Sequence, residues 1–302
     1  MRIVSLLPSA TEIVYALGLA DQLVGVTFEC DEPPQARRDN AVVVGGRDTS
    51  GMTPREIDDY VRGRAAAGED LYHLEHDALR GLAPELVLTQ DLCWVCAVPS
   101  ATVNEALAHL GCDSEVVTLD PYSLGDVLAT IEAVAGAAGV SERGAELVMS
   151  LRDRLAAVAA AVRGRACPRV AVVEWLDPPF AAGHWIPDLV TAAGGTPVAA
   201  RAGKRSVPVT WDEIADARPD VVVVTPCGYH LDGAAEQAEL AVAALPGVPV
   251  WAIDGDALIV RPGPRVVDGV EALAAILHPA AAAQLPDRSG AVRCVTGAVA
   301  IT

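Results

Sequence analysis

The chain has 302 residues, of which 52% are hydrophobic and 21% charged, and its 40 acidic against 22 basic side chains give a formal net charge of −18. This composition excludes a disordered protein and a small disulfide scaffold, because the chain is apolar and long enough to bury one or two cores. The acidity argues against binding to nucleic acid or to an anionic membrane surface, since both need clustered Lys and Arg.

Short β-branched segments alternate with alanine-rich helical segments along the chain, which is the pattern of an α/β fold. In the first half we predict strands at residues 2–6, 23–27, 41–44, 85–89 and 115–119. In the second half we predict strands at residues 169–175, 220–225, 248–253 and 257–260. Several of these segments are continuous apolar runs, which is typical of parallel strands covered on both faces.

A helical region separates the two sets of strands. Apolar residues from Leu124 to Ala135 recur at the spacing of one buried helix face, and Ser123 with Asp126 predicts a capping box before them. A second amphipathic stretch runs from Val148 to Val162. We therefore predict two Rossmann-like lobes with mostly parallel sheets, at residues 1–120 and 167–278, a bridging helical segment at 121–166, and a tail at 279–302 that adds a helix or a loose end.

The two halves also share a weak internal repeat. Residues 79–89 resemble residues 214–225, because each segment is a helix end, a Pro-acid turn, a buried strand and a Thr. Residues 2–6 similarly resemble residues 169–173. Two lobes of similar construction and chance similarity are both compatible with this pattern.

The seven cysteines are an odd number scattered over a long chain, which does not suit a disulfide framework. The first residues do not show the apolar core of a signal peptide, and no long uncharged apolar run suits a membrane span. The sequence therefore predicts no membrane insertion and a cytoplasmic location, where thiols are free or bind metals. Removal of an export signal would make a periplasmic or extracellular location the alternative.

Several segments together resemble a known family. The opening segment consists of residues 3–12 (IVSLLPSATE) and 16–19 (ALGL). It resembles the start of class III substrate-binding proteins of ABC transporters, which bind cobalamin, haem and iron–siderophore chelates. The other segments resemble the cobalamin-binding subgroup of that family: residues 29–34 (ECDEPP), 89–98 (TQDLCWVCAV), 183–187 (GHWIP) and 261–271 (RPGPRVVDGVE). The resemblance covers about residues 1–278. It implies two α/β lobes bridged by a long helix, a macrocyclic metal chelate in the cleft between the lobes, and an ABC permease as a partner.

Candidate ligand-binding residues follow the predicted strands, because open α/β sheets bind ligands beyond the carboxyl ends of their strands. Aromatic side chains there suit a flat macrocycle, and packing between the lobes is the alternative role for them. Pro8 and Ser9 follow the first strand, and Ser9 is predicted to cap a helix that starts at Ala10. The amides at the start of that helix either bind an anionic group of the ligand or serve only in the cap. The aromatic candidates are Phe28, Trp94, Trp175, Trp185 and Tyr229.

Two further side chains are candidates for direct contact with the ligand. His184, in a predicted loop, offers a ring nitrogen to cobalt or iron. Arg261 follows the last predicted strand in a rigid Pro-Gly turn, where it either reaches an anionic ligand group or pairs with acids at the rim of a lobe.

Four cysteines lie near predicted strand ends, and three interpretations are open for them. Cys93 and Cys96 have the C-x-x-C spacing that lets one turn present two thiolates to a metal, with Cys30 as a third ligand and His184 or Cys227 as a fourth. Redox chemistry at these thiols and simple burial of small side chains are the alternatives.

The sequence does not contain a nucleophile elbow, a P-loop, a GxGxxG motif, an HExxH motif or an EF-hand loop, so nothing in it indicates catalysis. The favoured hypothesis is a binding protein for cobalamin or a related metal-chelate macrocycle. The alternative is a cytoplasmic metalloprotein or enzyme on the same scaffold, with Cys30, Cys93 and Cys96 holding zinc, iron or an iron–sulfur cluster.

Overall fold

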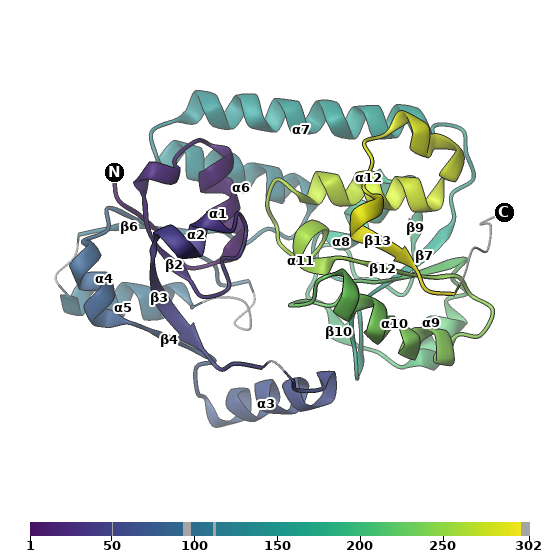
Figure 1. Ribbon diagram of the computed structural model, residues 1–302, viewed down its shortest axis with the longest axis horizontal. Coiled ribbons are helices and arrows are strands. Elements are labelled where there is room, and N and C mark those ends of the chain that lie inside the picture. Colours follow the sequence, from purple (N-terminus) through teal and green to yellow (C-terminus); the bar gives the residue numbers. More distant parts are fainter. Residues whose placement is uncertain (50, 93–97, 111–112, 297–302) are drawn as a thin grey trace. The chain divides into compact units, whose positions relative to one another are not determined.

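The computed structural model describes the chain except for residues 50, 93–97, 111–112 and 297–302 (Figure 1). The chain divides into two compact units. The first unit consists of Met1–Pro121 with Leu128–Met149, and the second of Tyr122–Val127 with Ser150–Thr302. The domain limits predicted from the sequence stay predictions.

The first unit contains a six-stranded sheet in the order β4-β3-β2-β1-β5-β6. All neighbouring strands in it are parallel except β4, which pairs antiparallel with β3 at the edge. The strands are β1 Ile3–Ser5, β2 Leu23–Thr27, β3 Ala41–Gly46, β4 Tyr72–Leu74, β5 Leu86–Thr89 and β6 Glu115–Thr118.

Helices cover this sheet. Helix α1 packs against β1 and β2, while apolar side chains of α4 and α5 join those of β1, β3 and β5 in one buried cluster. The helices and 3-10 turn of the unit are α1 Pro8–Ala16, η1 Ala20–Gln22, α2 Gln35–Asp39, α3 Pro54–Ala67, α4 His76–Leu82 and α5 Ser100–Leu110.

The predicted helical region forms two helices, α6 Leu124–Ala137 and α7 Ser141–Val162, and each contributes residues to both units. The predicted capping box is present, since the Ser123 hydroxyl accepts from the Asp126 N–H at 3.0 Å and the Asp126 carboxylate accepts from the Ser123 N–H at 2.9 Å. Gly139, with a positive φ of 71°, makes the turn between the helices.

The second unit contains a seven-stranded sheet in the order β10-β8-β7-β11-β12-β13, and β9 also pairs with β7. Strands β9, β7, β11 and β12 pair in parallel, whereas β8, β10 and β13 add antiparallel edges. The strands are β7 Arg169–Leu176, β8 Pro179–Ala181, β9 Thr196–Pro197, β10 Val207–Pro208, β11 Val221–Val224, β12 Val250–Ile253 and β13 Val292–Cys294.

Helices cover both faces of the second sheet. Side chains of α9 and α10 join those of β7, β11 and β12 in one apolar cluster, and α8 and α12 pack close to β7 on the opposite face, around Gly195 (Figure 1). The helices and 3-10 turns of the unit are α8 Ile186–Ala192, α9 Trp211–Asp216, α10 Leu231–Ala244, α11 Gly255–Leu258, α12 Val266–Leu277, η2 Pro279–Gln284 and η3 Ser289–Ala291. The predicted α/β fold with mostly parallel sheets is therefore confirmed.

Two local predictions were wrong. Residues 257–260 are not a strand, because the Asp254 side chain accepts from the Ala257 N–H at 2.9 Å and starts the short helix α11. Ser9 does not cap a helix that starts at Ala10, because α1 already begins at Pro8 with Leu7 as its N-cap. The tail predicted from residue 279 begins with the 3-10 helix η2, and it also contains β13, which pairs with β12 and was not predicted.

The internal repeat corresponds to matching contacts in the two units. Arg2 lies just before β1, and Arg169 is the first residue of β7, so each arginine lies at the start of an interior strand of its sheet. The Arg2 N–H donates to the Glu85 carboxylate at 2.7 Å, and the Arg169 N–H donates to the Asp220 carboxylate at 2.7 Å. In both units the acid follows a proline and precedes the strand that pairs with the arginine's own strand.

The guanidinium groups of Arg2 and Arg169 also make equivalent hydrogen bonds in the two units. Arg2 Nε donates to the Ala83 carbonyl at 2.8 Å, and Arg169 Nε donates to the Arg218 carbonyl at 3.0 Å. Ala83 and Arg218 both adopt positive φ angles, of 42° and 47°. The two repeated segments therefore make the same set of contacts in the two units.

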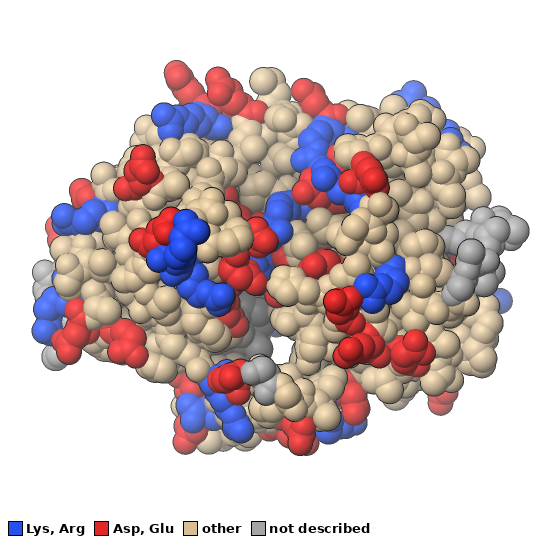
Figure 2. All heavy atoms as spheres, viewed as in Figure 1, with Lys and Arg blue, Asp and Glu red and all other residues tan. Residues whose placement is uncertain are grey.

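Among the described residues, no helix combines the length and the apolar character that a membrane span needs. On the face shown in Figure 2, Asp and Glu side chains are interspersed with Lys and Arg side chains.

Candidate functional site

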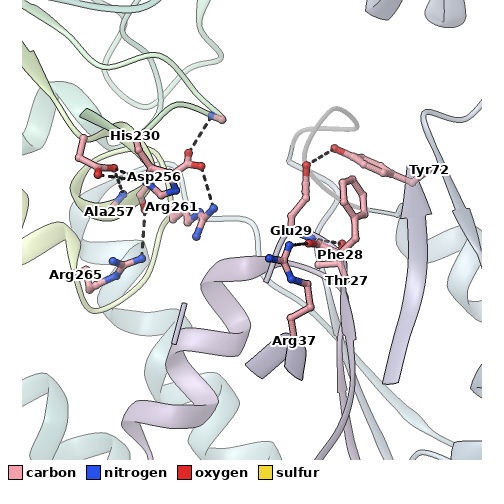
Figure 3. Close-up of polar contacts among 12 residues, drawn as sticks. Thr27, Phe28, Glu29, Arg37, Tyr72, His230, Asp256, Ala257, Arg261 and Arg265 are labelled. Atoms are coloured by element: carbon pink, nitrogen blue, oxygen red, sulfur yellow. Dashed lines mark hydrogen bonds and ion pairs between the residues drawn. The ribbon is translucent and has the colours of Figure 1, made fainter. Parts of the chain in front are cut away.

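In the first unit, an aromatic pair is formed by Phe28, which follows β2, and Tyr72, which begins β4 opposite the end of β3. The rings of Phe28 and Tyr72 are 6.0 Å apart between centroids, and the Tyr72 hydroxyl donates to the Glu29 carboxylate at 3.2 Å (Figure 3). Arg37 holds the backbone here by donating to the Phe28 carbonyl at 2.7 Å. Gly46 at the end of β3 lets the Phe28 ring approach, because a Cβ there would lie 2.8 Å from that ring.

Cys30 is fully buried in the first unit. Its Sγ lies 3.0 Å from the Thr11 hydroxyl, which also lies 2.9 Å from the Ser5 hydroxyl. Ser9 is 3% exposed and lies within α1. These contacts explain Cys30 as a small core thiol that links β2 to α1.

In the second unit, a second aromatic pair is formed by Trp175, near the end of β7, and Tyr229, which follows β11. The rings of Trp175 and Tyr229 are 5.9 Å apart between centroids. Burial raises the pKa of the Tyr229 hydroxyl above its ordinary value of 10.0, so the hydroxyl is protonated and able to donate at neutral pH. The Trp175 Nε1 is buried and has no hydrogen-bond partner among the described residues, so its donor capacity is unused within them.

Glu174 holds two loops of the second unit together. Its carboxylate accepts from the Gly183 N–H at 2.7 Å and from the Ser206 hydroxyl at 2.7 Å. The loops also exchange backbone hydrogen bonds at His184, whose N–H donates to the Lys204 carbonyl at 2.6 Å. Gly183 is required by this packing, because a Cβ there would lie 2.6 Å from that same carbonyl oxygen.

The loop holds His184 in an uncommon backbone conformation, with a φ of 50°. Its ring lies 5.7 Å from the rings of Tyr122 and Trp185. Burial, with a smaller effect of the Arg205 charge, lowers the pKa of His184 below its ordinary value of 6.5, so the imidazole is neutral at pH 7. Its Nε2 is buried without a hydrogen-bond partner in the described part of the chain. A neutral imidazole with an unpaired nitrogen is the form that binds a metal.

Arg261 is paired with an acid of its own unit. Its Nη2 donates to the Asp256 carboxylate at 3.0 Å, and the same carboxylate accepts from the Gly228 N–H at 2.9 Å. Arg265 donates to the Asp256 carbonyl at 3.4 Å. Of the two roles open for Arg261, the structure therefore shows an ion pair with an acid.

The structure brings some of the predicted site residues together within each unit and gives others a packing role. Trp175 meets Tyr229, and His184 meets Trp185, but Trp185 is only 5% exposed and its Nε1 donates to the Ile259 carbonyl at 2.9 Å. The predicted residues Trp94, Cys93 and Cys96 lie outside the described residues, and Cys227 is exposed. Tyr72, Glu174 and Asp256 were missed by the sequence analysis.

Comparison with known proteins identifies relatives over most of the chain. A family model described as periplasmic binding protein matches residues 3–248. A vitamin B12-binding protein of Vibrio cholerae serotype O1 is 28% identical over 279 residues, which cover 89% of this chain and 86% of that protein. An uncharacterized ABC transporter substrate-binding lipoprotein of Bacillus subtilis, YvrC, is 26% identical over 294 residues, which cover 92% of this chain and 80% of that protein.

Among solved structures, the periplasmic heme-binding protein RhuT from Roseiflexus sp. RS-1, in its apo form, is similar with a TM-score of 0.69 and 25% identity. The match covers 93% of this chain and 98% of that one. The resemblance inferred from the sequence motifs is thereby confirmed. The predicted cytoplasmic location and the zinc, iron or iron–sulfur hypothesis find no support among these relatives, one of which is a lipoprotein and one a periplasmic protein.

Proposed function

This chain belongs to the periplasmic binding protein family, and we propose that it binds cobalamin or a related metal-chelate macrocycle. The observation that carries the proposal is the similarity to a vitamin B12-binding protein over 89% of the chain. The strand-end residues support it, since each unit offers an aromatic pair at the carboxyl edge of its sheet, the edge where open α/β sheets bind ligands.

The chemistry of these side chains suits a large flat ligand with a polar edge. The rings of Phe28, Tyr72, Trp175 and Tyr229 offer apolar contact area to a macrocycle. The Trp175 Nε1 offers a hydrogen bond to a carbonyl on the edge of the ligand, because it has no partner in the described protein. Within this proposal, Phe28, Trp175 and Tyr229 keep the ligand-binding roles predicted for them.

His184 is the side chain that we propose to lie nearest the metal of the ligand. Its imidazole is neutral at pH 7, and its buried Nε2 lacks a partner within the described residues. Cobalt and iron both accept imidazole nitrogen as a ligand. Zinc or iron held directly by cysteines is not part of the proposal, because Cys30 is accounted for by its contact with Thr11.

We also propose that the protein acts outside the cytoplasmic membrane and delivers its ligand to an ABC permease. The support is the family itself and the relative described as an ABC transporter substrate-binding lipoprotein. The similar RhuT is a periplasmic protein.

The function is tested by titrating the purified protein with cyanocobalamin and with haemin, followed by calorimetry and by the shift of the ligand's visible spectrum. We expect one of the two to bind with a dissociation constant below about 10 μM, which corresponds to roughly −7 kcal/mol. Phe28→Ala and Trp175→Ala should each weaken binding about tenfold, whereas Trp211→Ala, on helix α9, is the matched control. Failure of both ligands to bind at tens of micromolar would contradict the proposal.

A further inference from the structure

The Asp256 carboxylate lies between a backbone N–H and a guanidinium in the second unit (Figure 3). It accepts from the Gly228 N–H at 2.9 Å and from Arg261 Nη2 at 3.0 Å. The side chains of Arg261 and Asp256 are only 12% and 10% exposed. Because the pair is largely shielded from water, the charge of Arg261 is compensated within the protein.

This ion pair lies at the edge of the sheet where the proposed ligand would meet the second unit. Gly228 follows β11, and Asp256 lies in α11, directly after β12. These two strands are parallel neighbours, so both segments lie at the same carboxyl edge. Glu174 lies near the end of β7 and adds a further carboxylate at this edge.

The ion pair with Asp256 determines whether Arg261 favours a carboxylate or a carboxamide on the periphery of the ligand. An unpaired guanidinium would bind a carboxylate through two parallel hydrogen bonds. With Asp256 already bound to it, an incoming carboxylate would lie close to a shielded like charge, which is unfavourable. A carboxamide avoids that repulsion, since its carbonyl accepts from the guanidinium and its NH2 group donates to a carboxylate.

We propose that Asp256 is a specificity residue that makes the second unit accept a macrocycle edged with carboxamides and reject one edged with carboxylates. The proposal rests on the proposed function, because it concerns the same ligand. If Asp256 only joined two loops, its loss would affect both kinds of macrocycle equally, whereas a specificity residue affects the preference between them.

The test compares two probes that share one corrin ring, dicyanocobinamide with peripheral amides and dicyanocobyrinic acid with peripheral carboxylic acids. The variant is Asp256→Asn, whose side-chain carbonyl still accepts from the Gly228 N–H while the negative charge is lost. The matched control is Asp232→Asn, which removes the same charge from an exposed carboxylate of the same unit that pairs with Arg293.

We expect the unchanged protein to prefer the amide probe by at least about tenfold, and Asp256→Asn to reduce that preference by about tenfold. Asp232→Asn should leave the preference unchanged within about twofold. Arg261→Gln leaves Asp256 without its cation and should increase the preference, so it provides a second readout if Asp256→Asn does not fold.

An equal loss of affinity for both probes in Asp256→Asn would show a purely structural role and overturn the inference. Equal shifts in Asp256→Asn and Asp232→Asn would overturn it as well, because a general effect of net charge would then explain the preference. In both cases the unchanged protein still binds a corrin, so the proposed function stands. If neither corrin probe binds the unchanged protein, the inference is overturned, and the titrations with cyanocobalamin and haemin then decide the proposed function separately.

Discussion

Helix α7 is held by one arginine in each unit, and the two arginines make contacts of different kinds. Arg143, in the first unit, donates to the Leu17 carbonyl at the end of α1, at 3.2 Å. Arg154, in the second unit, donates through Nε to Glu271 at 2.8 Å and also pairs with Asp268. The first contact caps a helix end, whereas the second belongs to a network of charges around a buried carboxylate.

The network in the second unit extends to the C-terminal segment. Glu271 is 1% exposed, and Arg288 donates to it at 2.8 Å. Burial by itself raises the pKa of Glu271, but hydrogen bonds and charges from Arg154 and Arg288 outweigh burial and bring the pKa below its ordinary value. Helix α7 is therefore tied within the second unit by ion pairs to a buried carboxylate, and within the first unit by a hydrogen bond to the carbonyl that ends α1.

The largest expected effect is the difference between Arg154→Ala and Arg143→Ala. Arg154→Ala should lower the free energy of unfolding by about 2–3 kcal/mol, because Glu271 stays buried with only one of its guanidinium partners. Arg143→Ala should cost about 0.5–1.5 kcal/mol, the contribution of an ordinary hydrogen bond. Urea unfolding followed by circular dichroism measures both values, and equal costs would contradict the comparison.

The pH dependence of stability tests the role of Glu271 separately. A carboxylate whose pKa is lowered by folding stabilises the protein fully above its unfolded pKa, near 4.5, and this contribution is lost as the pH falls through the folded pKa. The stability gap between the unchanged protein and Arg154→Ala should therefore be constant above about pH 5 and narrow below pH 4.5. For Arg143→Ala no such narrowing is expected, because its partner is a backbone carbonyl.

A smaller effect is expected at two glycines that allow close packing near the strand ends. In the second unit, a Cβ on Gly183 would lie against the backbone of residues 204–206, which cannot rotate away. In the first unit, a Cβ on Gly46 would meet the ring of Phe28, a side chain that can shift. Gly183→Ala should therefore cost about 2 kcal/mol and Gly46→Ala less than about 1 kcal/mol.

Thermal unfolding measures both costs, and Gly136→Ala is the control. A Cβ on Gly136 would meet nothing within 4 Å in helix α6, so this change should stabilise the protein by about 0.5–1 kcal/mol. Similar costs at Gly183 and Gly46 would mean that the loop of the second unit yields as easily as an aromatic side chain.

The smallest expected effect tests what the two units share. Ala83→Gly and Arg218→Gly should each stabilise the protein by about 0.5–1 kcal/mol, because both residues have positive φ angles that glycine adopts without strain. Ala217→Gly is the matched control and should destabilise, since Ala217 has a φ of −70°. Calorimetric melting curves give the values, and a gain at one position only would argue that the repeat is not equivalent in the two units.

The strands of the parallel core were predictable because their signals are local. Residues 23–27 were predicted as a strand and form β2, and the Pro-acid turns at Glu85 and Asp220 were visible as a repeat. The edge strands β9 and β10 were not predictable, because two residues carry no period and only their partners define them. Residues 257–260 were misassigned, since a short apolar run suits a strand and a helix equally.

The candidate site shows the same division. Phe28 and Tyr229 were found because each follows a strand along the chain. Tyr72 was missed because its contact with Glu29 joins residues 43 positions apart. Asp256 was missed for a related reason, since nothing near it in the sequence indicates that it binds Gly228, 28 positions away.

By itself, the sequence determined the α/β class, the family and the positions of most core strands, because these depend on local periodicity and short motifs. Only the tertiary structure decided that Cys30 contacts Thr11, that Arg261 is neutralised by Asp256, and that Arg154 holds α7 through a buried carboxylate. These are contacts between segments distant along the chain, and their energies depend on burial, which the order of residues does not reveal. Of the four cysteines that suggested a metal site, Cys93 and Cys96 lie outside the described residues, and the described strand ends carry two aromatic pairs and one ion pair.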